Sequence, residues 1–186
     1  LHNARRAATP IVNVIGDHAT YHRQYDAPLA SDIAAIAGAN SVWVKSADSP
    51  DLVGALAAEA VAAACAPPGG PASLILPADS AWLETARVGP KSARAPRAKV
   101  DGTIVDEIAK KIRAASKPVV LISGTLTGER GLRACARLAA AGVRVMMAGF
   151  TARQARGSGR FSPARMMYFA EQALEDLAGT DLMVLA

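Results

Sequence analysis

The sequence has few of the residues that mark secreted, membrane or metal-binding proteins. Its 186 residues include two cysteines, Cys65 and Cys135, each in an Ala-rich helical pattern without Cys or His at a metal-ligand spacing. We interpret both as buried structural thiols and predict no metal site. No apolar run approaches the roughly 20 residues that cross a bilayer, and the first residues do not follow the plan of a signal peptide. A cytoplasmic protein that does not contact membranes is expected.

Aromatic residues are scarce, at 4% of a chain that is 51% hydrophobic. The core is therefore expected to consist of Ala, Val, Ile and Leu, which is typical of parallel α/β layers. We interpret Trp43 and Trp82 as core or interface aromatics.

The net charge of +5 raises the question of a nucleic-acid partner. The basic residues, however, gather in two polar stretches without interleaved aromatics for base stacking. A solvated linker or loop is favoured over nucleic-acid binding for both stretches. They contain Arg87, Lys91, Arg94, Arg97 and Lys99 in the first, and Arg153, Arg156, Arg160 and Arg165 in the second.

Hydrophobic patterns predict strands and helices that alternate along the chain. This β-α-β order implies an α/β fold in which helices flank parallel sheets with right-handed crossovers. Strands are predicted at 10–15, 41–45, 72–76, 118–122, 143–147 and 182–186, and helices at 1–8, 33–37, 50–66, 103–112, 129–141 and 169–178.

Three local signals refine this prediction. Leu52, Leu56, Ala60 and Ala63 lie on one face of the helix predicted at 50–66 and are expected to pack. Thr103 and Asp106 resemble a capping box at the start of the next helix. Periodicity disappears in a basic stretch rich in Pro and Ala, so we expect a unit at 1–84, a linker at 85–100 and a second unit at 101–186.

The loop after the first strand holds the densest cluster of titratable and hydrogen-bonding side chains. The strand is expected to be buried, and loops at the carboxyl ends of parallel strands carry ligand chemistry. His18 and His22 are candidates for proton transfer near pH 7, with a surface or interface histidine as the alternative. Candidate binding residues for a substrate or cofactor are Gly16, Asp17, Tyr21, Gln24 and Asp26, although Asp26 is equally suited to stabilising the Ala27-Pro28 turn.

Two segments resemble a known family. Residues 9–29, TPIVNVIGDHATYHRQYDAPL, are similar to the strand and active-site loop in the pyrimidine-binding domain of thiamine-diphosphate-dependent enzymes of the acetolactate synthase type. Residues 168–174, YFAEQAL, resemble the central domain of the same family. The resemblance implies two Rossmann-like units: the C-terminal half of a pyrimidine-binding domain and a truncated central domain.

The activity implied is that of a lyase or transferase that decarboxylates a 2-oxo acid such as pyruvate and releases or transfers the acyl unit. Thiamine diphosphate and Mg²⁺ are the implied cofactors, and a homodimer or homotetramer is the implied assembly. The family's catalytic Glu and its Gly-Asp-Gly…Asn magnesium motif do not occur in this sequence. The chain is therefore expected to be an internal fragment, truncated at both ends and inactive alone. Related decarboxylases carry adjacent histidines in this loop, whereas His18 and His22 are four positions apart.

Two alternatives remain open. A non-catalytic module could bind FAD or another nucleotide in the second unit, although Gly124 and Gly128 lack the full dinucleotide fingerprint and an ordinary turn is favoured. The loop from Arg156 to Arg160 could likewise grip a phosphate, but a solvated loop is the simpler interpretation. The chain could also be a folding fragment without activity, whose exposed sheet edges would lead it to aggregate or dimerise.

Overall fold

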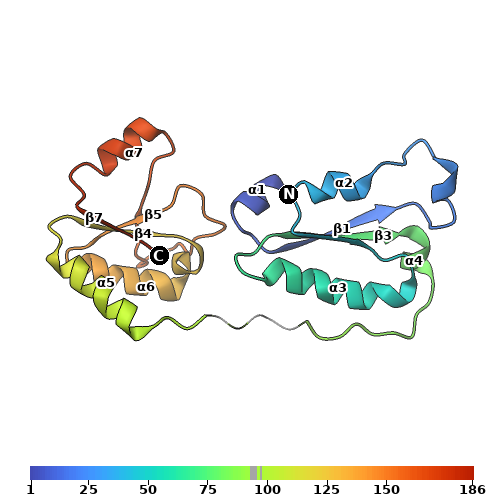
Figure 1. Ribbon diagram of the computed structural model, residues 1–186, viewed down its shortest axis with the longest axis horizontal. Coiled ribbons are helices and arrows are strands. Elements are labelled where there is room, and N and C mark those ends of the chain that lie inside the picture. Colours follow the sequence, from blue (N-terminus) through green and yellow to red (C-terminus); the bar gives the residue numbers. More distant parts are fainter. Residues whose placement is uncertain (93–95, 97) are drawn as a thin grey trace. The chain divides into compact units, whose positions relative to one another are not determined.

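Both halves of the chain form parallel sheets covered by helices, as the sequence predicts (Figure 1). The computed structural model describes residues 1–92, 96 and 98–186, so Arg94 and Arg97 of the predicted linker lie outside the described residues. The chain divides into two compact units, Leu1–Arg97 and Ala98–Ala186.

The first unit has a three-stranded parallel sheet in the order β1-β3-β2. Helix α3 lies on one face, and α1 and α2 lie on the other (Figure 1). The elements are α1 (His2–Arg6), β1 (Ile11–Asp17), α2 (Ile33–Gly38), β2 (Trp43–Ser46), α3 (Pro50–Cys65), β3 (Pro71–Pro77) and α4 (Ala78–Trp82). Asp32 caps α2 by accepting from the Ala35 N–H at 2.9 Å.

Small side chains join α3 to the central strand. Ala60, Ala64 and Ala72 are buried together, which allows the helix to lie close to the sheet. The predicted face of α3 was partly wrong, since Leu52 is 45% exposed and Ala64 is buried instead. Strand β1 was also expected to be buried, but its burial alternates. Helix α2 packs on β2 and β3, and Val14 on β1 stays 57% exposed.

The beginning of the predicted linker lies along α3 (Figure 1). Thr85 Oγ1 donates to Asp51 Oδ1 at 2.6 Å, and Arg87 Nε is 3.4 Å from Asp51 Oδ2. The backbones of Gly54 and Gly89 touch, since a Cβ on Gly89 would lie 2.2 Å from the Gly54 oxygen. This part of the linker is therefore docked on the first unit, which its composition did not predict.

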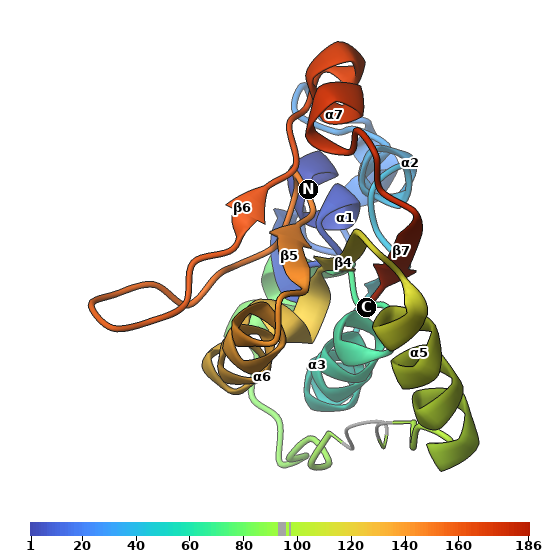
Figure 2. The same cartoon turned by 90° about the vertical axis from the view of Figure 1, so that its left-hand side faces the viewer.

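The second unit has a four-stranded parallel sheet in the order β6-β5-β4-β7. Helices α5 and α6 lie on one face, and α7 lies on the other side (Figure 2). The elements are α5 (Gly102–Ala114), β4 (Pro118–Ile122), α6 (Glu129–Ala140), β5 (Arg144–Met147), β6 (Ala164–Arg165), α7 (Ala170–Asp176) and β7 (Leu182–Leu185).

An aliphatic core fills the space between α6 and this sheet. Ile122, Leu132 and Met147 are at most 2% exposed, and Cys135 is buried with them. Cys135 is 2% exposed, which confirms its predicted burial, and this burial raises the pKa of its thiol. Cys65 is only half-buried, so the prediction of a buried thiol was wrong there. No helix in the described part of the chain is both long and apolar enough to cross a membrane.

The predicted capping box at the start of α5 was wrong. Asp101 is the capping residue, and its Oδ1 accepts from the Thr103 N–H at 2.9 Å and from the Thr103 hydroxyl at 2.8 Å. A carboxylate one position before the helix bonds the free N–H groups of the first turn directly, so Thr103 becomes a donor inside that turn.

Packing of α6 on the turn that follows β4 predicts a glycine requirement. A Cβ on Gly131 would lie 2.3 Å from the Leu126 carbonyl oxygen, so Gly131→Ala should reduce the stability of the second unit by about 1–3 kcal/mol. Gly102→Ala is the matched control, because nothing lies within 4 Å of a Cβ there. Hydrogen exchange of the β4 and β5 amides at increasing urea concentrations measures the unfolding of the second unit. Equal unfolding midpoints for both variants would contradict the prediction.

Candidate functional site

The loop after β1 folds back over the carboxyl ends of the three strands of the first unit. The His22 N–H donates to the Ala19 oxygen at 2.8 Å, and a single 3-10 turn covers Arg23–Tyr25. Asp26 ends the turn in the left-handed region, with φ of 46°. Asp tolerates this conformation better than most residues, which supports the structural alternative for Asp26.

Arg23 joins this loop to two strand ends. Its Nε donates to Asp17 Oδ2 at 2.8 Å, and its Nη1 donates to Asp48 Oδ1 at 2.9 Å. Its Nη2 donates to Ser46 Oγ at 3.0 Å, and Ser46 Oγ donates in turn to Asp48. Asp17 also accepts from the His18 N–H at 2.7 Å. Arg23 therefore bonds the end of β1 and the residues at the end of β2.

Hydrogen bonds and neighbouring charges shift the pKa values of Arg23 and Asp48. Partial burial acts to lower the pKa of Arg23, but bonds to Asp48 and Asp17 and their charges raise it. The pKa of Asp48 is lowered by the bond from Ser46, and, against partial burial, by Arg23. The charged forms of both residues are thus favoured at neutral pH.

A second set of contacts, the clamp formed by Thr20 and Asp79, fixes the loop at the end of β3. The Thr20 N–H donates to Asp79 Oδ1 at 2.9 Å, and the Thr20 hydroxyl donates to Asp79 Oδ2 at 2.5 Å. These bonds, the hydroxyl first, lower the pKa of Asp79. Each of the three strands is therefore linked to the loop by an aspartate at or just beyond its carboxyl end.

The clamped loop places its aromatic side chains in a row. The rings of His18 and His22 stack with centroids 5.4 Å apart and an interplanar angle of 10°. His22 meets Tyr25 edge to face at 5.8 Å, and His18 Nδ1 lies 3.8 Å from Asp17 Oδ1. A cavity of about 190 Å³ opens beside the two imidazoles. Its lining consists of Asp17, His18, His22, Arg23, Ala27, Ala30 and Ser31.

Three of the seven candidate residues, Asp17, His18 and His22, line this cavity. Tyr21 is 63% exposed, and its carbonyl accepts from Gln24 Nε2 at 3.0 Å. Gly16 lies next to the end of β1, and nothing lies within 4 Å of the position that a Cβ would take there. The chemical roles of all seven residues remain predictions.

Sequence reasoning missed the residues that hold the loop. These are Thr20, Arg23, Ser46, Asp48 and Asp79. The available signal was an aspartate within three residues of the end of each predicted strand of the first unit, and within two residues of each observed one. Which loop residue each aspartate would bind was not readable from spacing.

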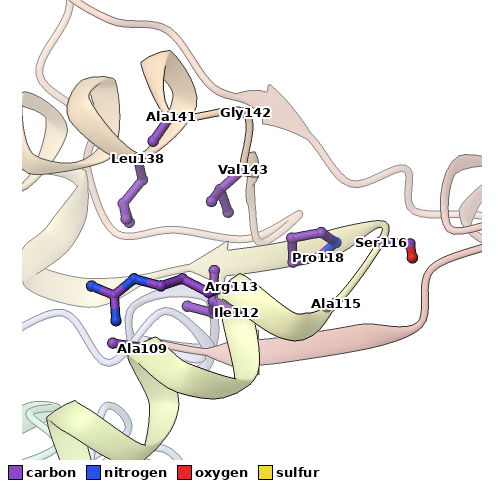
Figure 3. Close-up of a pocket in the computed structure, with 10 residues that line it drawn as sticks. All are labelled: Ala109, Ile112, Arg113, Ala115, Ser116, Pro118, Leu138, Ala141, Gly142 and Val143. Atoms are coloured by element: carbon purple, nitrogen blue, oxygen red, sulfur yellow. The ribbon is translucent and has the colours of Figure 1, made fainter.

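A larger cavity, of about 490 Å³, lies in the second unit between α5 and α6 (Figure 3). It opens at the amino ends of β4 and β5, and the side chains of Ile112, Leu138 and Val143 form its walls. Arg113 is the charged residue of its lining. Without a cluster of titratable groups, this cavity offers no chemistry comparable to that of the histidine loop.

The loop from Arg156 to Arg160, a candidate for phosphate binding, has its Arg160 side chain bonded to other protein groups. Arg160 Nη1 donates to the Arg156 oxygen at 2.8 Å, and its Nη2 lies 3.5 Å from Glu129 Oε2. Gly124 begins a 3-10 turn instead of a dinucleotide-binding helix start. Within the described ranges, no group of three His, Cys, Asp or Glu residues is placed to hold a metal ion.

Comparison with known proteins shows what the chain resembles. It is 44% identical over 188 residues to the "Putative acetolactate synthase large subunit IlvX" of Mycobacterium tuberculosis. That alignment covers 100% of this chain but 36% of the relative, so the chain spans about a third of the relative's length. No protein-family model matches.

Solved structures give the same picture for the fold. A thiamine diphosphate-dependent 4-hydroxybenzoylformate decarboxylase of Rhodococcus jostii superimposes with a TM-score of 0.76 and 19% identity, over 100% of this chain and 36% of that one. The "putative thiamin diphosphate-dependent enzyme" of Mycobacterium smegmatis gives 0.75 and 20%, over 99% and 36%. The resemblance to an acetolactate synthase large subunit-like protein is thus confirmed, and the chain shares its fold with about a third of two solved thiamine-diphosphate-dependent enzymes.

The clamp at Asp79 predicts a pH dependence. Its pKa is lower in the folded chain than the unfolded value of about 3.9, so the bond contributes stability above that value. The contribution disappears as the pH falls through the lower folded pKa. The NMR shift of the Thr20 amide should therefore report a titration of Asp79 with a midpoint below about pH 3.9. Thr20→Val removes the hydroxyl bond and should move that midpoint upward. A midpoint at the ordinary value in the unmodified chain would contradict this prediction.

Proposed function

We propose that this chain, related over its whole length to an acetolactate synthase large subunit-like protein, is part of a thiamine-diphosphate-dependent lyase or transferase. The intact protein would decarboxylate a 2-oxo acid such as pyruvate and release or transfer the acyl unit. In this proposal, residues 1–84 are half of the pyrimidine-binding domain and residues 101–186 belong to the central domain. The loop that carries His18 and His22 faces the reacting carbon.

The observation that carries the proposal is the pair of stacked imidazoles beside a cavity at the carboxyl edge of a parallel sheet. Ligands of open α/β sheets bind at that edge. The relationship to the acetolactate synthase-like protein, which extends over the whole chain, supports the choice of reaction.

The residues present fit only part of the cofactor. The cavity of about 190 Å³ is smaller than the roughly 300 Å³ at which ligand pockets begin. Arg23 is bonded to two carboxylates, so its charge is not available to a diphosphate group. The chain would therefore form one wall of the active site, and residues outside it would hold the diphosphate and Mg²⁺.

Within that wall, each side chain has a proposed task. Thiamine diphosphate, when bound, supplies the group that stabilises the electron pair left when carbon dioxide departs. His18 and His22 would hold or move protons near pH 7, and Asp17 would orient His18. Tyr21 and Gln24 would hydrogen-bond the carboxylate or carbonyl of the 2-oxo acid. Gly16 would let the substrate approach the backbone, and Asp26 would shape the turn.

The assembly is also part of the proposal. Because the cavity is incomplete in this chain, a second subunit would complete it, and a homodimer or homotetramer of the intact protein is expected. In the described part of the chain, Arg160 is paired with Glu129, which disfavours the loop from Arg156 to Arg160 as a nucleotide phosphate site.

Replacement of His18 tests the catalytic role. In the intact protein, His18→Ala should lower turnover about 100-fold, as expected for loss of a proton-transfer group, and should change cofactor affinity much less. His2→Ala is the matched control, because His2 begins α1 and lies outside the loop. Unchanged turnover in the His18 variant, measured by pyruvate consumption, would remove His18 from the mechanism.

Calorimetric titration of this chain with Mg²⁺ and thiamine diphosphate tests the division of the site. We expect no saturable heat, because the described residues leave no cation free for the diphosphate at the loop. Saturable binding would show that the chain holds the cofactor without further residues, and the one-wall proposal would have to be abandoned.

A further inference from the structure

Peptide neighbours connect the Arg23 network directly to the two histidines. Asp17, which accepts from Arg23, immediately precedes His18, and Arg23 immediately follows His22. The Asp17–Arg23 bond therefore closes the loop at positions adjacent to both imidazoles. With the bond closed, the rings stack at 5.4 Å.

The geometry of the Arg23 guanidinium suits it to holding the loop in one position. Three different nitrogens of its guanidinium bond three different residues, Asp17, Asp48 and Ser46, at 2.8, 2.9 and 3.0 Å. A planar fork with fixed directions sets both the position and the orientation of the loop, whereas a lysine ammonium would supply one point charge. The Arg23 side chain is 34% exposed and Asp17 16%, so the bond lies at the wall of the cavity.

The charges around Arg23 argue against a role in binding a substrate carboxylate. Two carboxylates, Asp17 and Asp48, face one guanidinium, so the negative charges outnumber the positive one and a further anion is disfavoured. Each of the three guanidinium nitrogens already donates to a protein oxygen, and Nη2 also lies 2.8 Å from Asp17 Oδ2. The contacts describe a residue that holds the protein's own groups in place.

We propose that Arg23 is a positioning residue that fixes the separation of His18 and His22 by bonding the ends of β1 and β2 to their loop. Thr20 and Asp79 fix the loop independently at the end of β3, so loss of Arg23 releases the imidazoles without unfolding the unit. The catalytic consequence rests on the proposed function; the ring geometry does not.

Nuclear Overhauser effects between the ring protons of His18 and His22 test the geometry in this chain. Arg23→Gln should abolish the effect, and Arg23→Lys should restore it only in part, since it bonds one carboxylate at a time. Arg6→Gln, at an exposed arginine of α1, is the matched control. The Thr20 amide signal should stay unchanged in every variant, which shows that the second clamp and the unit remain folded. An undiminished ring contact in Arg23→Gln would overturn the proposal.

Turnover of the intact protein separates this inference from the proposed function. We expect Arg23→Gln to lower kcat about 10- to 100-fold with a smaller change in KM, because a displacement of about 1 Å can cost about 100-fold. Loss of the ring contact with unchanged kcat would support the positioning role and sink the catalytic role of the histidines. If His18→Ala is inactive while Arg23→Gln keeps both contact and kcat, the proposed function stands and the positioning role fails.

Discussion

Parallel alignment of three strands determines most of what the first unit can do. Strand β3 lies between β1 and β2, with Asp17 opposite Pro77 and Ser46 opposite Ile75. All three carboxyl ends therefore meet at one edge, and each contributes an aspartate that binds the loop after β1. If one strand ran the other way, its carboxylate would lie at the opposite edge and the loop would lose that contact.

The central strand can hold this place because its neighbours are small or aliphatic. Six of the seven residues of β3 are buried, and Ala60 and Ala64 of α3 pack on Ala72. A buried Ser73 links the strands laterally, since its hydroxyl lies 2.8 Å from Ser41 Oγ and 3.2 Å from Asn13 Nδ2. These polar groups satisfy one another, which a low-dielectric interior requires. The rigid sheet then gives the loop three fixed points.

Fold and function have different support in this chain. Solved structures at 19% and 20% identity share the parallel-sheet architecture, and architecture of this kind carries many reactions. The relative at 44% identity is stronger support for a related reaction than the solved structures are, but this chain spans only about a third of that relative. The proposed role therefore depends on the site itself, where two imidazoles and a carboxylate line one small cavity.

The sequence by itself determined the order of the main elements, the parallel α/β class and the family resemblance. Strand runs such as 72–76 and the stops at Gly and Pro are local signals, and local signals are readable without a fold. It also indicated the loop with His18 and His22, because polar residues after an apolar run stand out.

Only the tertiary structure decided which side chains meet. Arg23 and Asp48 lie 25 positions apart, and Thr20 and Asp79 lie 59 apart, so no spacing rule could pair them. It likewise decided that Leu52 and Val14 are exposed, that Asp101 caps α5 in place of the predicted Thr103, and that the linker docks on α3. Each of these outcomes depends on packing between segments distant in sequence or on competition between nearby hydrogen-bonding groups, which a one-dimensional pattern does not resolve.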